Sequence, residues 1–301
     1  MKERDISDNK IKTELSLNDF LQLLELSYFE LIKKGLKALS LFSPKLTARI
    51  AWKFFTTPRL KRKPSQSFLE QMSIEEIDYQ GHKVTTYIHN PHGSNSILLV
   101  HGWEGQASDF VALLLSLLDH RFKVISFDSP AHGLSHGKSV NAVDYSQIIQ
   151  ELTKKHGPFE AIVGHSMGAF ASTHALAHSP EHIANKLVTI GAPNKLTTII
   201  HKFIKAMDLS YEVEIELFKL IEKNFHLKVE NSSTGHYSSM ATNTQKLFIH
   251  DEYDRQVPIE RLDELIELNP DAQIHRTYTL GHSRILKDNY TIEKIIDFIK
   301  S

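Results

Sequence analysis

The sequence contains no cysteine among its 301 residues. Disulfide bonds, thiolate catalysis and cysteine-ligated zinc are therefore excluded, and a reducing compartment is compatible with this composition. No run of about 18 apolar residues occurs, so the sequence predicts no membrane-spanning helix. The first ten residues, MKERDISDNK, are charged and lead into no uninterrupted apolar core of the kind found in a signal peptide, which favours a cytoplasmic location.

The sequence also lacks a strong excess of charge of either sign. Thirty-five Lys and Arg residues face 36 Asp and Glu residues, and the formal net charge is −1. No global field therefore steers the chain toward nucleic acid, and we expect no nucleic-acid partner. The 18 histidines are scattered and none falls in an HExxH or similar ligand spacing, so we expect no metal and no cofactor.

Short apolar segments alternate with helical patterns from residue 96 onward. We predict strands at 96–102, 123–128, 161–163, 186–193, 246–251 and 273–280, with helices near 108–118, 141–155, 169–177, 258–267 and 290–300. This alternation is typical of βαβ units and predicts an α/β fold with a mostly parallel central sheet and helices on both faces. Ahead of it, residues from Ile74 alternate around Gln80-Gly81 and predict a β-hairpin.

Two segments depart from the alternation. Residues 1–70 predict a helical N-terminal extension, with helices over 15–56 and the basic, proline-flanked linker TTPRLKRKPS. Residues 192–245 interrupt the series between the sixth and seventh strands, and much of this insertion is amphipathic helix. Its two apolar helix faces contain Ile199, Ile200, Phe203, Ile204 and Met207, and then Leu217, Phe218, Ile221 and Phe225.

The stretch EAIVGHSMGAF places Ser166 between Gly164 and Gly168, after a short apolar run and before a helix-forming run. A side chain at the apex of so sharp a strand-to-helix turn lies in a strained backbone region, and its neighbours must be small. The pattern G-x-S-x-G is that of a nucleophile elbow, although a plain glycine-serine turn also fits it. The elbow interpretation predicts Ser166 as a nucleophile.

Loops beyond the carboxyl ends of parallel strands carry the active groups of such sheets. In LLVHGWEGQ, the backbone N–H of Trp103 can point toward Ser166, and the N–H of Met167 lies at a helix N-terminus. Two backbone donors directed at one oxygen form an oxyanion hole, typically worth about 3 kcal/mol or more in the transition state. The alternative is a glycine-rich turn whose tryptophan packs in the protein interior.

Two later loops supply an acid and a base. In FIHDEYDRQVP, Asp254 is the candidate acid, Asp251 and Glu252 compete with it, and an aspartate-rich turn that caps the next helix is the alternative. In TYTLGHSRIL, His282 follows the last strand and can reach back to the serine. The chain order Ser166, Asp254, His282 is the order of one of the three common serine-hydrolase arrangements.

With these motifs, the sequence resembles the α/β-hydrolase superfamily of serine esterases and lipases from about Ile74 to Ser301. HGWEG is similar to its oxyanion loop, DSPAHGLS to its D-x-P-G-H-G-x-S loop, GHSMGA to its elbow, HDEYDRQVP to its acid loop and GHS to its histidine loop. Ala131 and Asp251 stand where the family usually has glycine. The resemblance implies a hydrolase domain over 71–301, with the 192–245 insertion as its lid.

The resemblance implies acyl transfer through a Ser166, Asp254 and His282 triad, with Trp103 and Met167 N–H groups holding the oxyanion. The expected partner is a small acyl substrate carrying a carboxylic ester or thioester. A carbon–carbon or amide hydrolase on the same triad, and a non-catalytic ligand-binding homologue, stay open as alternatives.

The N-terminal extension contains ten basic residues and no acid between Leu31 and Pro64. Lys45, Arg49 and Lys53 recur every fourth residue beside the apolar series Leu46, Ile50 and Phe54. Two interpretations stay open. Either these basic helices make a peripheral contact with an anionic membrane, or they cover the hydrolase core, bury Trp52, Phe54 and Phe55 and leave their charges in water. The sequence does not determine an oligomeric state.

Overall fold

The computed structural model of the chain describes residues 17–64, 66–70 and 72–301; within these ranges, the side chains of 17–28 and 67 are not described. An eight-stranded sheet with the order β1-β2-β4-β3-β5-β6-β7-β8 forms its centre. The strands are β1 (Ser73–Tyr79), β2 (His82–His89), β3 (Ser96–Val100), β4 (Lys123–Phe127), β5 (Phe159–His165), β6 (Ala184–Ile190), β7 (Gln245–Asp251) and β8 (Gln273–Thr277). β1 pairs antiparallel with β2 and β2 with β4, while the other pairs are parallel. The prediction of a mostly parallel sheet is confirmed.

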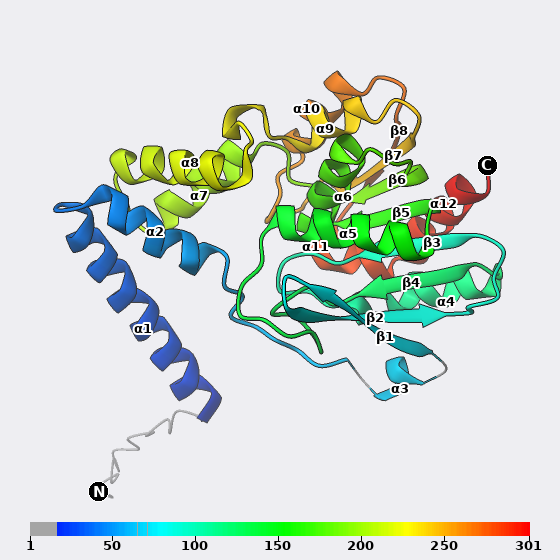
Figure 1. Cartoon of the computed structure of the whole chain (residues 1–301), viewed down its shortest axis with the longest axis horizontal. Helices are drawn as coiled ribbons and strands as arrows, with labels where there is room; N and C mark the ends of the chain where they lie inside the picture. The colour runs from blue at the N-terminus through cyan, green and yellow to red at the C-terminus, as the bar shows by residue number, and fades with distance from the viewer. Residues whose placement is uncertain (1–16, 65, 71) are drawn as a thin grey trace, which may run out of the picture.

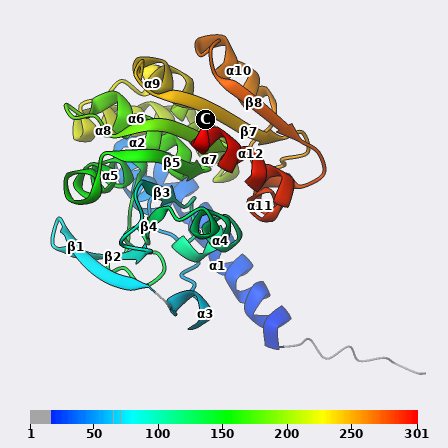
Figure 2. The same ribbon diagram turned by 90° about the vertical axis from the view of Figure 1, so that its right-hand side faces the viewer.

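The first helices precede the sheet along the chain, and later helices cover both of its faces (Figures 1 and 2). In chain order they are α1 (Leu17–Ser40), α2 (Pro44–Phe55), α3 (Gln66–Leu69), η1 (Ala107–Phe110), α4 (Val111–Asp119), α5 (Ala142–His156), α6 (Met167–His178), α7 (Leu196–Ala206), α8 (Tyr211–Phe225), η2 (Val229–Asn231), α9 (Thr234–Met240), α10 (Glu260–Leu268), α11 (Gly281–Arg284), η3 (Ile285–Lys287) and α12 (Asn289–Lys300).

Side chains of the central strands alternate between two hydrophobic cores. Ile97 and Leu99 of β3 pack with residues of α4 and α12, whereas Leu98 and Val100 pack with residues of α5 and α6. Because successive side chains of a strand point to opposite faces, a strand that is apolar throughout can be buried on both sides. The continuous run SILLV in β3 is therefore explained by its central position in the sheet.

Several element boundaries differ from the predicted ones. The strands predicted to end at 102 and 193 end at Val100 and Ile190. Gly191 has a φ of +58°, a left-handed conformation that ends the extended backbone. The last predicted strand stops at Thr277, and the short helix α11 follows it, where the sequence pattern indicated only a loop.

The N-terminal helices pack on the insertion between β6 and β7. Ser43 caps α2 by accepting a hydrogen bond from Leu46 N–H, and Pro44 occupies the first turn, where no N–H is needed. The ring of Trp52 lies 5.7 Å from that of Phe225 on α8, and the ring of Phe55 lies 4.9 Å from that of Phe203 on α7. The aromatic side of α2 thus contacts α7 and α8.

The predicted start of the first helix, at residues 15 and 16, lies outside the described residues. None of the helices in the described ranges combines the length and apolarity that crossing a bilayer requires.

Candidate active site

The candidate site lies between the parallel strands β3 and β5, where the chain continues from β3 to β4 on one side of the sheet and from β5 to β6 on the other. β3 is paired with β4 on one side and with β5 on the other, and Val100 stands opposite Gly164 in the β3–β5 register. Loops at such a topological switch point form a crevice at the carboxyl ends of the strands. The loops after β3 and β5, which contain Trp103 and Ser166, are therefore side by side.

Ser166 occupies a strained turn between β5 and α6. Its φ and ψ are 53° and −121°, a conformation that a non-glycine residue rarely adopts. A Cβ on Gly168 would lie 2.2 Å from the carbonyl oxygen of Val100, and one on Gly164 would lie 2.7 Å from Ala169 Cα. Both flanking positions must therefore be glycine, and the local geometry is that of a nucleophile elbow.

Two backbone N–H groups beside Ser166 are free to bind an oxyanion. Met167 is the first residue of α6, and its N–H carries the positive end of the helix dipole. Neither Met167 N–H nor Trp103 N–H donates to an acceptor in the part of the chain that the structure describes. The loop of Trp103 approaches closely because residue 102 is glycine: a Cβ there would lie 3.0 Å from Ser166 Cβ.

Asp254 and His282 form a buried hydrogen-bonded pair. His282 Nδ1 lies 2.6 Å from Asp254 Oδ2, and both side chains are almost inaccessible to solvent. Asp254 Oδ1 accepts hydrogen bonds from the N–H groups of Gln256 and Val257, at 2.8 and 2.9 Å. Burial raises the pKa of Asp254, but the hydrogen bonds from His282, Val257 and Gln256 outweigh it and the pKa is lowered overall. Asp254 is thus held as a carboxylate.

The two competing acids of this loop make other contacts. Asp251 accepts hydrogen bonds from Thr277 Oγ1 at 2.8 Å and from the N–H groups of Tyr253 and Leu280, both at 2.9 Å. Glu252 forms an ion pair with Arg276 at 3.1 Å. Of the three acids, Asp254 is therefore the one placed against His282.

His165, which the sequence analysis did not single out, connects the elbow to the histidine loop. Its Nε2 donates to the carbonyl oxygen of His282 at 2.8 Å, and the two rings are 4.7 Å apart. Burial, together with the charge of His282, lowers the pKa of His165 to about 3, so its ring is neutral. The position directly before Ser166 was the only sequence signal for this role.

His132 holds the loop of Trp103 and Glu104 in a similar way. Its Nε2 accepts a hydrogen bond from Glu104 N–H at 3.0 Å, while Nδ1 lies 3.0 Å from the carbonyl oxygen of Pro130. Burial lowers its pKa to about 3, which keeps Nε2 free to accept. Ala131, beside it, has a φ of +65° where the resembled family usually has glycine.

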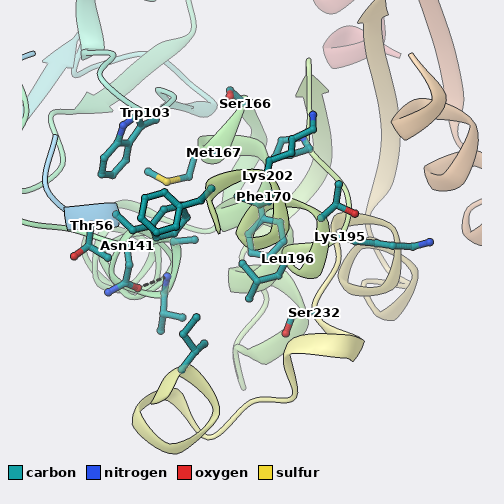
Figure 3. A pocket seen from close by; sticks show the side chains of 18 of the residues that line it. Thr56, Trp103, Asn141, Ser166, Met167, Phe170, Lys195, Leu196, Lys202 and Ser232 are labelled. Atoms are coloured by element: carbon teal, nitrogen blue, oxygen red, sulfur yellow. Dashed lines mark hydrogen bonds between the residues drawn. The ribbon is translucent and has the colours of Figure 1, made fainter. Parts of the chain in front are cut away.

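Ser166 lines a cavity of about 550 Å³ that lies between the loops at the edge of the sheet, α2 and the insertion. Figure 3 shows Trp103, Met167 and Ser166 at one end, with Leu196 and Ser232 toward the other. Aromatic side chains dominate much of the wall: Trp52, Phe54, Phe55, Phe170, Phe203, Phe225 and Tyr237. The cavity is within the size range of small-molecule sites.

The structure brings Asp254 and His282 into direct contact, and His165, the residue before Ser166, contacts the carbonyl oxygen of His282. The hydroxyl of Ser166 has no hydrogen-bond partner within the described residues. Catalytic hydrogen bonds are often long in a ligand-free site and shorten when substrate binds. The five residues predicted for the site are all at the carboxyl-terminal edge of the sheet, because they lie just after β3, β5, β7 or β8 in the chain. They are Trp103, Ser166, Met167, Asp254 and His282.

Comparison with known proteins gives the same fold. A model of the alpha/beta hydrolase family matches residues 97–230. No curated protein matches the chain significantly. An esterase from Pyrococcus furiosus, Pf2001, is 19% identical with a TM-score of 0.61, over 81% of this chain and 96% of that one.

Two further solved structures are similar. A thioesterase domain from the curacin biosynthetic pathway is 16% identical with a TM-score of 0.55, over 76% of this chain and 99% of that one. Mouse alpha/beta hydrolase domain-containing protein 10 is 18% identical with a TM-score of 0.57, over 76% and 97%. At these identities the likeness concerns the fold. The chain therefore has the α/β-hydrolase fold, and its residues 97–230 match a model of the alpha/beta hydrolase family.

Proposed function

We propose that the protein is a serine hydrolase that cleaves a carboxylic ester or thioester through Ser166, His282 and Asp254. The observation that carries this proposal is the buried 2.6 Å pair of His282 and Asp254 behind a serine in a strained strand-to-helix turn. A fold by itself does not define a reaction, and these side chains are what support the chemistry.

In the first step, Ser166 Oγ attacks the acyl carbon while His282 Nε2 takes the hydroxyl proton. His282 Nδ1–H donates to Asp254, which selects the tautomer with a free Nε2 and stabilises the imidazolium that forms. The carbonyl oxygen becomes an oxyanion that accepts from the N–H groups of Trp103 and Met167. His282 then gives its proton to the leaving alcohol or thiol, and an acyl-enzyme remains.

In the second step, water attacks the acyl-enzyme, with His282 as the base. The proton returns to Ser166 Oγ, and the acid product leaves. The neighbouring imidazoles are too weakly basic to compete for these protons. Burial is the main cause: it lowers the pKa of His101 to about 4 and that of His165 to about 3.

The cavity supports a substrate with an apolar acyl group. Its aromatic wall comes from α2, α6, α7 and α8, and Phe55 and Phe203 face each other there with ring centroids 4.9 Å apart. An acyl chain that enters this space loses contact with water, which favours binding by about 0.8 kcal/mol per methylene group. The solved esterase and thioesterase of similar fold are in keeping with this reaction class.

A fluorophosphonate probe tests the nucleophile directly. We expect labelling of the wild-type protein, and its loss in Ser166→Ala and His282→Ala. Ester hydrolysis should fall by about 10⁴ to 10⁶ in kcat in the same variants, because the members of a triad act as one unit. Ser179→Ala, at the other end of α6, is the matched control and should be labelled like the wild type.

The alternatives predict other results. The protein could take the probe and hydrolyse no ester or thioester, but cleave an amide or a carbon–carbon bond. In that case the proposed triad would stand and the proposed substrate class would be wrong. A folded wild-type protein that neither takes the probe nor hydrolyses any ester refutes the proposal and favours a non-catalytic binding protein.

A further inference from the structure

Helix α2 presents both cations and large apolar side chains to solvent. Its buried residues are Thr47, Ala48 and Ala51. At about 100° per residue, the opposite side of the helix contains Lys45, Leu46, Arg49, Ile50 and Lys53. We call these five residues the outer face of α2; its three cations are exposed, and Leu46 and Ile50 are 45% and 41% exposed.

The turn between α1 and α2 adds two more exposed apolar side chains. Leu41 and Phe42 are 81% and 86% exposed, although both are residues that normally lie in a core. Figure 1 shows this turn, in blue, at an extremity of the molecule far from the sheet. An apolar tip next to an amphipathic helix is accessible to a large flat partner.

The charge of this region is strongly positive and largely unpaired. Residues 31–64 contain ten cations and no acid, whereas the whole chain carries −1, so the remainder carries −11. Lys37 pairs with Asp208, and Arg62 with Asp109. Among the described residues, the three cations of the outer face, Lys45, Arg49 and Lys53, form no ion pair within 4 Å, and only Lys45 lies near an acid, Glu216, whose pKa it helps to lower after the larger effect of Lys219.

We propose that the outer face of α2 and the α1–α2 turn dock on an anionic lipid bilayer. Cations flanking inserted apolar side chains are the feature that interfacial helices use, since the charges attract the lipid headgroups and the apolar groups enter the acyl boundary. Nucleic acid would use the cations but would leave the tip residues Leu41 and Phe42 in water. A second copy of the chain, paired through the same face, would bring like charges together.

The docking surface and the cavity share one helix. Trp52 and Phe55, which line the cavity, lie toward the inner side of α2, so the cavity and the bilayer are separated by about one helix diameter, roughly 10 Å. If the proposed hydrolase function holds, this arrangement supplies acyl substrates from the bilayer. The docking itself is independent of that function.

Flotation with lipid vesicles tests the docking. Full-length protein should bind vesicles containing 30% phosphatidylserine at low salt, bind phosphatidylcholine vesicles weakly, and be released by 0.5 M NaCl. The triple variant Lys45→Glu, Arg49→Glu, Lys53→Glu should bind at least about 100-fold more weakly, since each cation contributes about a factor of five. Leu41→Ser with Phe42→Ser should weaken binding while its salt dependence remains.

Matched controls carry the same changes elsewhere on the surface. Lys138→Glu, Lys287→Glu and Lys300→Glu together alter three exposed cations outside the region, and Leu268→Ser replaces an apolar residue with 49% exposure. These variants should bind like the wild type. Circular dichroism and thermal melting establish that each variant is folded, so the readout does not depend on the hydrolase proposal.

Three results would overturn the docking proposal. They are the absence of binding to anionic vesicles at low salt, equal loss of binding in the control triple variant, and a solution dimer that the Leu41→Ser, Phe42→Ser variant disrupts. If the outer-face variants lose vesicle binding and keep full activity toward a water-soluble ester, docking and catalysis are separate properties, as proposed.

Discussion

The substitution Asp254→Asn changes a single charge at the centre of the proposed mechanism. Asp254 accepts hydrogen bonds from His282 Nδ1 at 2.6 Å and from two backbone N–H groups at 2.8 and 2.9 Å. An asparagine keeps one oxygen, which can still accept from the backbone. Its NH₂ group then faces His282 Nδ1 and, being a donor, favours the tautomer with the proton on Nε2. That tautomer cannot take a proton from Ser166.

The expected cost is therefore large for catalysis and small for folding. A wrong tautomer in a serine triad lowers kcat by about 10⁴, which is about 5 kcal/mol of transition-state stabilisation. The loss of one charge-assisted hydrogen bond lowers the free energy of unfolding by about 1 to 3 kcal/mol. The variant should be folded and nearly inactive.

Asp251→Asn is the matched control in the same loop. Asp251 also accepts three hydrogen bonds, from Thr277, Tyr253 and Leu280, but has no contact with His282 among them. We expect a similar loss of stability and a kcat within about tenfold of the wild type. The assay compares kcat and KM for a water-soluble ester with the melting temperature of each variant. An active Asp254→Asn beside an inactive, folded Asp251→Asn would refute the assignment of the acid.

Three other outcomes follow from the site. First, kcat/KM should rise from acetyl to octanoyl esters by up to about fourfold per methylene group as the aromatic cavity fills; a flat or falling series points to a small polar substrate. Second, Gly102→Ala should lower kcat about tenfold or more, because its Cβ would lie 3.0 Å from Ser166 Cβ and 3.2 Å from the carbonyl oxygen of His165. Gly35→Ala, which meets nothing within 4 Å, should leave kcat unchanged. Third, stability should fall as pH drops below about 6.5, because burial lowers the folded-state pKa of four histidines to about 3 or 4 while the unfolded chain protonates them near 6.5. Each contributes up to about 1.4 kcal/mol per pH unit in this window, and fluorescence-detected unfolding at pH 7, 6 and 5 measures the sum; a free energy of unfolding that does not change with pH contradicts it. The four are His101, His132, His165 and His174.

The amino-acid sequence determines the series of strands and helices and the loops of the candidate site, because these depend on local patterns. SILLV is a short apolar run of the kind found in buried strands, and EAIVGHSMGAF adds the two glycines that a tight turn at Ser166 requires. Chain order then places Ser166, Asp254 and His282 in loops that a parallel sheet gathers at one edge.

Contacts between distant segments are decided only by the tertiary structure. The sequence left Asp251, Glu252 and Asp254 as competing acids three residues apart or fewer, and the packing of the loop after β7 against α11 places Asp254 on His282. The roles of His132 and His165 depend on partners 28 and 117 residues away. No local pattern encodes such pairs.

The same holds for the N-terminal extension. Helical periodicity predicts both a basic and an apolar series on α2, but it does not tell which side meets the rest of the protein. In the structure, small residues such as Ala48 and Ala51 face inward and allow close approach to α8, while Leu46 and Ile50 remain exposed. The inner face is chosen by the fit between two helix surfaces that lie far apart in the sequence, and this fit exists only once the whole chain has folded.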